Sequence, residues 1–245
     1  MSNRNGAGRS ARAMEVARRG AGGPADRKKS AVLWDLDGTL VDSGDYHWRS
    51  WRDTMAAVGF TVTYQQFLDS FGQKNDRILA QWLGADATVD RVRRIADAKE
   101  HEYRRLAREE GLVALPGAAD WVTRLRDHGW RQAIASSAPR ANVEVMLGVL
   151  RLANGFDAIV SAEDVTAGKP DPEVFLKAAD RLSTSPADCI VVEDAAAGIE
   201  AARRAGMRSI GVSRTATLDA DLFVRSLADL PADAFSALVL RSNRG

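Results

Sequence analysis

Short apolar segments recur along this chain, and stretches with helical spacing separate most of them. Apolar runs of about four to eight residues, bounded by turn residues, are typical of strands buried on both faces of a sheet. Strands that alternate with helices indicate a parallel sheet covered by helices. We therefore predict an α/β fold with a Rossmann-like parallel sheet, whose strands lie at residues 31–35, 132–135, 158–160, 189–193, 208–212 and about 221–225.

A long segment, residues 45–111, separates the first predicted strand from the second. The reactive crevice of an open α/β sheet lies at the carboxyl ends of its strands, and this segment leaves the sheet at that end. We therefore predict an inserted α-helical cap that covers the crevice and excludes water. In its last helix we expect charged side chains such as Lys99 to face solvent. The helices predicted for the cap span residues 46–58, 64–70, 75–83 and 89–110.

Charge is distributed unevenly along the chain. Residues 1–29 hold eight Lys or Arg and two Asp or Glu with little apolar content, which predicts a disordered N-terminal extension. The same composition leaves open a transit peptide or a tail that binds nucleic acid. The remainder holds 26 Lys or Arg and 31 Asp or Glu, and this mildly acidic body argues against a nucleic-acid partner. The α/β core is then predicted at residues 30–44 and 112–245.

The cysteine content and the hydropathy of the chain bear on its location. One cysteine, Cys189, excludes an intrachain disulfide and fits a reducing compartment. No window of about 18 apolar residues predicts a membrane span, and the N-terminus has no apolar signal core. We therefore expect a cytoplasmic protein with no membrane partner.

Two carboxylates, Asp35 and Asp37, follow the first predicted strand and point the same way from its end. Like charges held this close repel each other, and desolvation adds to the cost. A divalent cation would relieve this repulsion, and a carboxylate beside a metal can attack phosphorus to form an aspartyl phosphate. The pattern alone is weakly specific, because it also occurs in turns and calcium loops.

Further polar residues follow the later strands in order. Ser136 follows the second strand and precedes a helix, whose positive end and main-chain N–H groups favour an anion. Lys169, held between glycine and proline, would add a positive charge. Glu193 and Asp194 end the fourth apolar run and offer the oxygen ligands that Mg²⁺ prefers. The sequence contains no His/Cys cluster for zinc and no glycine-rich nucleotide loop.

Residues 31–240 resemble the haloacid dehalogenase superfamily, in the branch with a helical cap that contains phosphoglycolate phosphatase-like enzymes and β-phosphoglucomutase. The motifs that carry the resemblance are Asp35-Leu-Asp37-Gly-Thr39, Ser136-Ser137-Ala-Pro139, Gly168-Lys169-Pro170 and Glu193-Asp194. The resemblance implies that Asp35 is the nucleophile and Asp37 the general acid/base, with Ser136 and Lys169 as catalytic residues that hold the phosphoryl group. It also implies a Mg²⁺ site formed by Asp35, the main-chain carbonyl of Asp37, Asp194 and Glu193.

The resemblance extends to residues that would contact the substrate. His47 matches a cap-hinge histidine of β-phosphoglucomutases, although sugar phosphatases carry it too. A solvent-facing or locally bonded helix histidine remains an alternative. Mutases of this kind grip a second phosphate with a cap arginine, and the aligned position here holds Asn75. The expected substrate-binding residues are Leu36, His47, Gly72, Lys74, Asn75, Arg77, Ser136 and Lys169.

A mutase needs two anion-binding sites, whereas a phosphatase needs one such site and a water molecule. Because the cap arginine is missing, we expect a Mg²⁺-dependent phosphatase of a small phosphorylated metabolite such as a sugar phosphate. A β-phosphoglucomutase-like mutase is one alternative, and a non-catalytic binding module on the same fold is another. By resemblance we expect a monomer.

Overall fold

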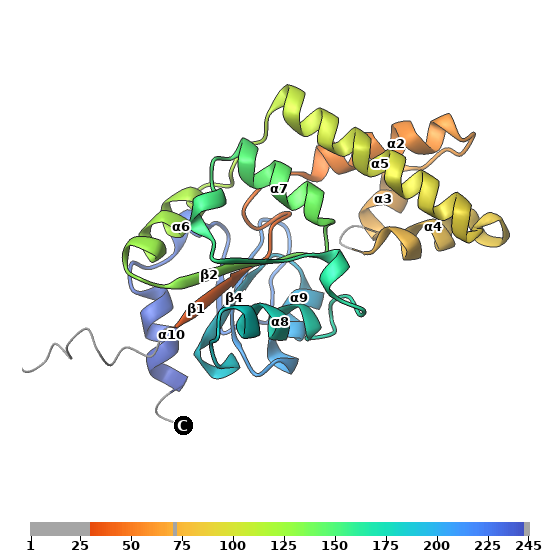
Figure 1. Cartoon of the computed structure of the whole chain (residues 1–245). Coiled ribbons are helices and arrows are strands. Elements are labelled where there is room, and N and C mark those ends of the chain that lie inside the picture. The colour runs from red at the N-terminus through yellow and green to blue at the C-terminus, as the bar shows by residue number, and fades with distance from the viewer. Residues whose placement is uncertain (1–29, 71–72, 243–245) are drawn as a thin grey trace, which may run out of the picture.

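The computed structural model describes residues 30–70 and 73–242 of the chain. Its centre is a six-stranded sheet with the order β3-β2-β1-β4-β5-β6, in which every neighbouring pair is parallel. The predicted α/β fold with a Rossmann-like sheet is therefore confirmed (Figure 1). The strands are β1 (Ala31–Trp34), β2 (Arg131–Ala135), β3 (Ala158–Val160), β4 (Cys189–Glu193), β5 (Arg208–Val212) and β6 (Leu222–Val224).

Strand β1 lies between β2 and β4, and all of its side chains are buried. Trp34 at its end pairs with Ile134 on one side and with Val192 on the other. This register brings the ends of the three strands to the same edge of the sheet. The polar residues that follow these strands are therefore placed next to one another.

Helices cover both faces of the sheet (Figure 1). On one face α6 (Ala118–Asp127), α7 (Arg140–Val149) and α10 (Ala234–Ser242) bury apolar side chains against alternate strand residues such as Trp34. On the other face α8 (Glu173–Arg181) and α9 (Ala196–Arg204) do the same against residues such as Leu33. Short 3₁₀ turns complete the described elements at Gly84–Asp86, Ala153–Gly155, Ala162–Asp164, Pro186–Asp188 and Leu227–Asp229.

A group of helices is inserted between β1 and β2 and extends away from the sheet (Figure 1). These helices share an apolar cluster of their own, which includes Trp51, Met55, Phe67 and Leu79. The last helix also packs against α7 of the core. The inserted helices are α2 (Gly44–Ala57), α3 (Tyr64–Ser70), α4 (Asn75–Leu83) and α5 (Val89–Glu110).

The prediction that Lys99 faces solvent is wrong, because its side chain is buried. Ile95, Lys99 and Tyr103 recur at intervals of four residues, so Lys99 lies on the apolar stripe of α5. The amino group of Lys99 contacts two polar side chains, those of His47 and Glu100. Among residues 30–70 and 73–242, no helix has the length and apolar character needed to span a membrane.

Candidate active site

Three buried polar side chains lie at adjacent strand ends. Asp35 follows β1, Ser136 follows β2, and Glu193 is the last residue of β4. The main-chain N–H of Asp35 donates to Val192 O at 3.0 Å, which continues the pairing of β1 with β4 and fixes the start of the loop. The parallel register thus builds one polar site at the carboxyl edge of the sheet.

Lys169 joins two of these carboxylates. Its Nζ lies 2.6 Å from Asp35 Oδ1 and 2.5 Å from Glu193 Oε1, and 5.0 Å from the centre of the Phe175 ring. Burial alone would lower the pKa of Lys169, but the two carboxylates raise it above its usual value. The amine therefore carries a fixed positive charge between Asp35 and Glu193.

Asp35, Glu193 and Asp194 form an acidic cluster in which each offers an oxygen within 4.8 Å of the others. Burial and neighbouring carboxylates raise the pKa of Asp35 to about 7 and that of Asp194 to about 9. Such a cluster is costly unless a proton or a cation compensates it. A set of carboxylate oxygens suits a hard divalent cation, so these residues fit a metal site.

Two glycines leave room for the acidic cluster. Gly38 has a positive φ of 82°, and a Cβ on it would lie 2.1 Å from Asp194 Oδ2. A Cβ on Gly198 in α9 would lie 1.9 Å from Glu193 Oε1. Any larger residue at either position would displace a carboxylate of the cluster.

The second carboxylate of the Asp35-Leu-Asp37 motif has different partners. Asp37 Oδ1 accepts hydrogen bonds from Ser43 Oγ at 2.5 Å and from His47 Nε2 at 3.1 Å. Burial would raise the pKa of Asp37, but His47 and Ser43 hold it below its usual value. Both bonds end on Oδ1, so Oδ2 is the oxygen that can exchange a proton with a bound molecule.

The orientation of His47 is set from α5. Lys99 Nζ lies 2.9 Å from His47 Nδ1, and the imidazole stacks on the Tyr103 ring with centres 4.2 Å apart. Because an ammonium group only donates, Nδ1 must accept, and Nε2 then carries the hydrogen that points to Asp37. His47 is therefore a locally bonded donor and does not face solvent, and its contact with a substrate stays a prediction.

Ser136 has its hydroxyl group at the same edge of the sheet. Its Oγ accepts a hydrogen bond from the main-chain N–H of Ala138 at 3.0 Å, and its own N–H donates to Val160 O at 3.0 Å. The loop is thereby held in place, while the hydroxyl hydrogen can still be donated to an anion.

The sequence profile of the haloacid dehalogenase-like hydrolases matches residues 32–212, which is more than half of the chain. The chain belongs to this family. The family prediction is thus confirmed, and with it the prediction that the chain is an enzyme of the hydrolase class.

Curated relatives of this haloacid dehalogenase-like hydrolase have several names. It is 33% identical to β-phosphoglucomutase of Bacillus subtilis over 82% of this chain and 91% of that protein. It is 30% identical to hexitol phosphatase B of Escherichia coli K12 over 89% of this chain and 98% of that protein. A third relative, SUPPRESSOR OF QUENCHING 1 of Arabidopsis thaliana, is 38% identical over 77% of this chain, which spans only 18% of that protein.

A solved structure shares the fold of this hydrolase. CbbY from Rhodobacter sphaeroides in complex with phosphate matches with a TM-score of 0.78 and 26% identity. The match covers 84% of this chain and 99% of that one, so the inserted helices have a counterpart in the solved structure.

The substrate-binding residues predicted for the inserted helices lie in different surroundings. Lys74 reaches the core, where its Nζ donates to Val165 O at 3.2 Å. Asn75 instead donates to Glu100 Oε1 at 2.7 Å, and Arg77 lies exposed on α4. Gly72 lies outside the described residues.

Leu36 also belongs to the predicted substrate-binding set. Its side chain is buried in the main apolar cluster of the hydrolase. Only the main chain of Leu36 is therefore left to contact a ligand.

Sequence reasoning missed four polar residues of this region, which are Ser43, Lys99, Glu100 and Asn142. Lys99 carried a signal, because a lysine at apolar spacing in a helix needs a buried partner. Glu100 and Asn142 carried none, since their contacts depend on how α5 packs against α4 and α7. Ser43 carried none, because its hydrogen bond to Asp37 depends on the conformation of the loop after β1.

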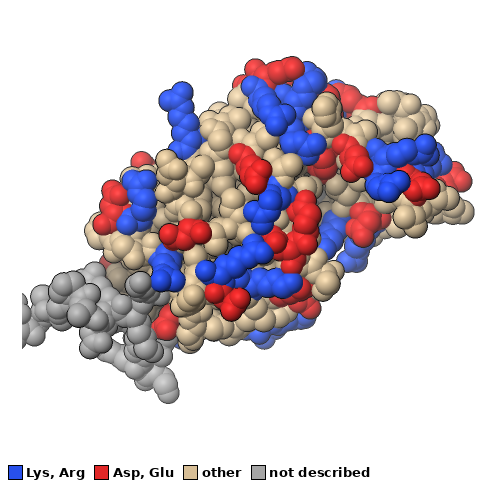
Figure 2. All heavy atoms as spheres, in the orientation of Figure 1, with Lys and Arg blue, Asp and Glu red and all other residues tan. Residues whose placement is uncertain are grey.

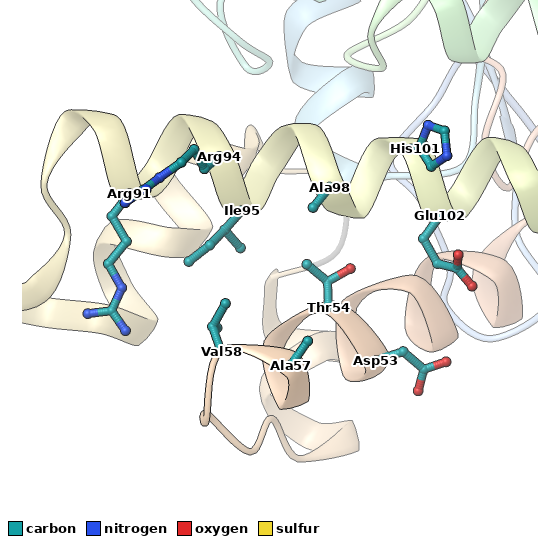
Figure 3. A pocket seen from close by; sticks show the side chains of 10 residues that line it. All are labelled: Asp53, Thr54, Ala57, Val58, Arg91, Arg94, Ile95, Ala98, His101 and Glu102. Carbon is teal, nitrogen blue, oxygen red and sulfur yellow. The ribbon is translucent and has the colours of Figure 1, made fainter.

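A groove of about 740 Å³ lies between α2 and α5, on the inserted helices (Figure 3). Its floor includes Ala57, Ile95 and Ala98, and none of the site residues named above lines it. On the face shown in Figure 2, acidic and basic side chains of the described residues are interspersed.

Proposed function

We propose that the chain is a Mg²⁺-dependent phosphoric monoester hydrolase that acts on a small phosphorylated metabolite, such as a sugar phosphate. The observation that carries the proposal is the buried Asp35 carboxylate, held by Lys169 and grouped with Glu193 and Asp194. The relatives named as a hexitol phosphatase and a phosphoglucomutase support a phosphorylated sugar or sugar alcohol as substrate. The phosphate bound by the solved CbbY supports phosphate recognition.

In this proposal Asp35 attacks phosphorus in line with the leaving oxygen and becomes an aspartyl phosphate. Lys169 neutralises charge on Asp35 and on the phosphoryl oxygens, and the Ser136 hydroxyl donates to one of them. Asp37 Oδ2 gives a proton to the leaving oxygen and later takes one from the attacking water. Hydrogen bonds from His47 and Ser43 favour the ionised form of Asp37, which the second step uses, whereas the first step requires Asp37 to have taken up a proton.

The proposed Mg²⁺ would be held by Asp35, the main-chain carbonyl of Asp37 and Asp194, with Glu193 bound directly or through water. When bound, the cation supplies charge neutralisation at the phosphoryl group. The oxygen-only donor set and the raised pKa of Asp194 support this proposal, because a cation would relieve the carboxylate repulsion.

We further propose that residues 45–111 act as a cap over a core formed by residues 30–44 and 112–245. The hydrogen bond from Lys74 to Val165 O supports contact between this cap and the loop that carries Lys169. A monomeric state and a cytoplasmic location stay predictions.

A β-phosphoglucomutase-like mutase is the second candidate, because the Bacillus subtilis relative carries that name. Asn75 stands where such mutases carry their cap arginine, and its amide is already engaged by Glu100. Lys74 or Arg77 would have to bind a second phosphate instead. We therefore favour the phosphatase.

The test compares wild type with Asp35→Asn on 4-nitrophenyl phosphate, with Mg²⁺ and with a chelator. The matched control is Asp45→Asn, an exposed carboxylate that pairs with Arg49 on α2. The proposal expects Asp35→Asn and the chelator to abolish turnover, and Asp45→Asn to retain it. Activity in Asp35→Asn would contradict the nucleophile assignment. With β-glucose 1-phosphate, glucose 6-phosphate formed much faster than free phosphate would favour the mutase.

A further inference from the structure

Glu100 is a buried carboxylate at the junction between the inserted helices and the core. Its Oε1 accepts hydrogen bonds from Lys99 Nζ at 2.9 Å and from Asn75 Nδ2 at 2.7 Å. Its Oε2 accepts from Asn142 Nδ2 at 2.5 Å, and Arg104 donates to Asn142 Oδ1 at 2.8 Å. Glu100 thus has donors from α4, α5 and the core helix α7.

Each of these donors connects Glu100 to a different part of the candidate site. Lys99 lies against His47, whose Nε2 points to Asp37. Asn75 is the first residue of α4 and follows Lys74, which contacts the core. Asn142 is in the first turn of α7, the helix that follows Ser136. The Glu100 carboxylate therefore contacts Lys99, which holds the His47 donor of Asp37. It also contacts Asn142, which lies in the helix that follows Ser136.

Lys99 depends on this carboxylate because it is almost fully buried. Its Nζ lies 5.3 Å from the ring centre of Trp51 and 5.4 Å from that of Tyr103, which are cation–π contacts that favour the ammonium group. Burial away from water still disfavours the charge, and the Glu100 carboxylate compensates it. Removing one partner of a buried ion pair leaves the other partner uncompensated. Without Glu100, Lys99 would move away from His47, or would become a neutral amine that can accept as well as donate, and the tautomer of His47 would no longer be fixed.

We propose that Glu100 is a positioning residue, whose carboxylate anchors Lys99 to Asn142 of the core and so fixes the hydrogen bond from His47 to Asp37. This inference rests on the proposed function, because it assigns proton transfer to Asp37. Glu100 does not touch the substrate and acts through Lys99 and His47. Its loss should therefore slow the reaction most where the leaving group needs a proton.

The test uses two aryl phosphates with different needs for a general acid. The 4-nitrophenolate ion leaves without much protonation, whereas phenolate is a poorer leaving group that gains more from a proton donor. We expect Glu100→Gln to lower kcat/KM for phenyl phosphate at least about tenfold more than for 4-nitrophenyl phosphate, within the range of general-acid contributions. The matched control is Glu102→Gln on the same helix, a surface residue bonded to Arg105, which should change both values equally and little.

A second variant keeps the test decisive if Glu100→Gln does not fold. Asn142→Ala removes one of the three donors to Glu100 without removing a charge, and we expect a smaller loss with the same preference for phenyl phosphate. Far-ultraviolet circular dichroism checks the fold of each variant, and if Glu100→Gln is unfolded the result for Asn142→Ala decides. Equal losses on both substrates, or no loss, would overturn the positioning role.

The variant Asp35→Asn separates this inference from the proposed function. If Asp35→Asn retains turnover, the proposed function itself fails. If it is inactive while the Glu100 and Asn142 variants show no dependence on the leaving group, only the positioning role fails.

Discussion

The pKa of each carboxyl in this site is set by its neighbouring side chains more than by its residue type. Asp35 and Asp37 are two residues apart and both buried, yet the pKa of Asp35 is raised and that of Asp37 is lowered. Asp35 is desolvated and lies beside Glu193, whereas Asp37 accepts hydrogen bonds from Ser43 and His47. Burial alone therefore does not set the pKa of either carboxyl, and the hydrogen bonds of Asp37 outweigh its desolvation.

Replacing Lys169 should be more damaging than its single charge suggests. Lys169→Met keeps most of the buried volume but leaves Asp35 and Glu193 without their cation. We expect kcat/KM for 4-nitrophenyl phosphate to fall by about 10²–10³-fold, as when a preorganised donor is removed. The control Lys177→Met, at a half-exposed lysine of α8, should stay close to wild type. A loss of less than about threefold in Lys169→Met would contradict the role given to this amine.

At the scale of single elements, replacing each of two helical glycines by alanine should have opposite effects on stability. Apart from the backbone of its own helix, no atom lies within 4 Å of the position that a Cβ on Gly148 in α7 would take, so Gly148→Ala should stabilise the protein by about 0.5–1 kcal/mol. In Gly198→Ala the same gain in helix propensity competes with the clash against Glu193 Oε1. Overpacking costs about 1–3 kcal/mol, so a net loss of stability and of activity is expected. Urea unfolding of both variants measures the change in the free energy of unfolding relative to wild type. A stabilised, fully active Gly198→Ala would contradict the close packing of Gly198 against Glu193.

The turn before α8 should show a pH-dependent contribution to stability. Asp164 accepts hydrogen bonds from Arg181 and Arg140 and caps its own 3₁₀ turn through Ser161, and these donors lower its pKa well below the usual value. A lowered pKa means that the stabilisation is complete above the unfolded-state pKa and is lost as the pH falls toward the folded-state value.

We therefore expect Asp164→Asn to lower the free energy of unfolding by about 1–3 kcal/mol at neutral pH. The gap to wild type should shrink below about pH 4, where the unfolded carboxyl takes up its proton. Urea titrations at neutral and acidic pH, with Asp180→Asn on the exposed face of α8 as control, measure the gap. If the difference in the free energy of unfolding between Asp164→Asn and wild type did not depend on pH, the charge of Asp164 would not be the source of the stabilisation.

At the scale of the whole molecule, the sheet and the residues at its strand ends could be predicted from the sequence. The helices α3, α4 and α5 begin and end where the pattern predicted, because their apolar spacing is regular. Asp35 and Glu193 were found because a parallel sheet gathers its carboxyl ends at one edge. Helical periodicity placed Lys99 on the apolar stripe of α5, so its burial could have been predicted, whereas the contacts of Glu100 result from packing between distant helices, which periodicity does not report.

In the assembled molecule, side chains of the inserted helices hold Asp37, the proposed acid/base residue of the core. Asp37 lies on the loop after β1, but its donor His47 comes from α2 and is held in turn by Lys99 of α5. The position of the inserted helices is therefore coupled, through direct contacts, to the hydrogen bonding of Asp37. This coupling would link closure over a substrate to proton transfer.

Detecting a phosphoryl group on Asp35 tests the proposed mechanism most directly. The variant Asp37→Asn lacks the base that activates water, so the phosphorylated enzyme should accumulate when 4-nitrophenyl phosphate and Mg²⁺ are added. After acid quenching, peptide mass spectrometry should find one phosphoryl group, located on Asp35. Release of 4-nitrophenolate with no modified Asp35, or with the phosphoryl group on another residue, would contradict the aspartyl-phosphate mechanism.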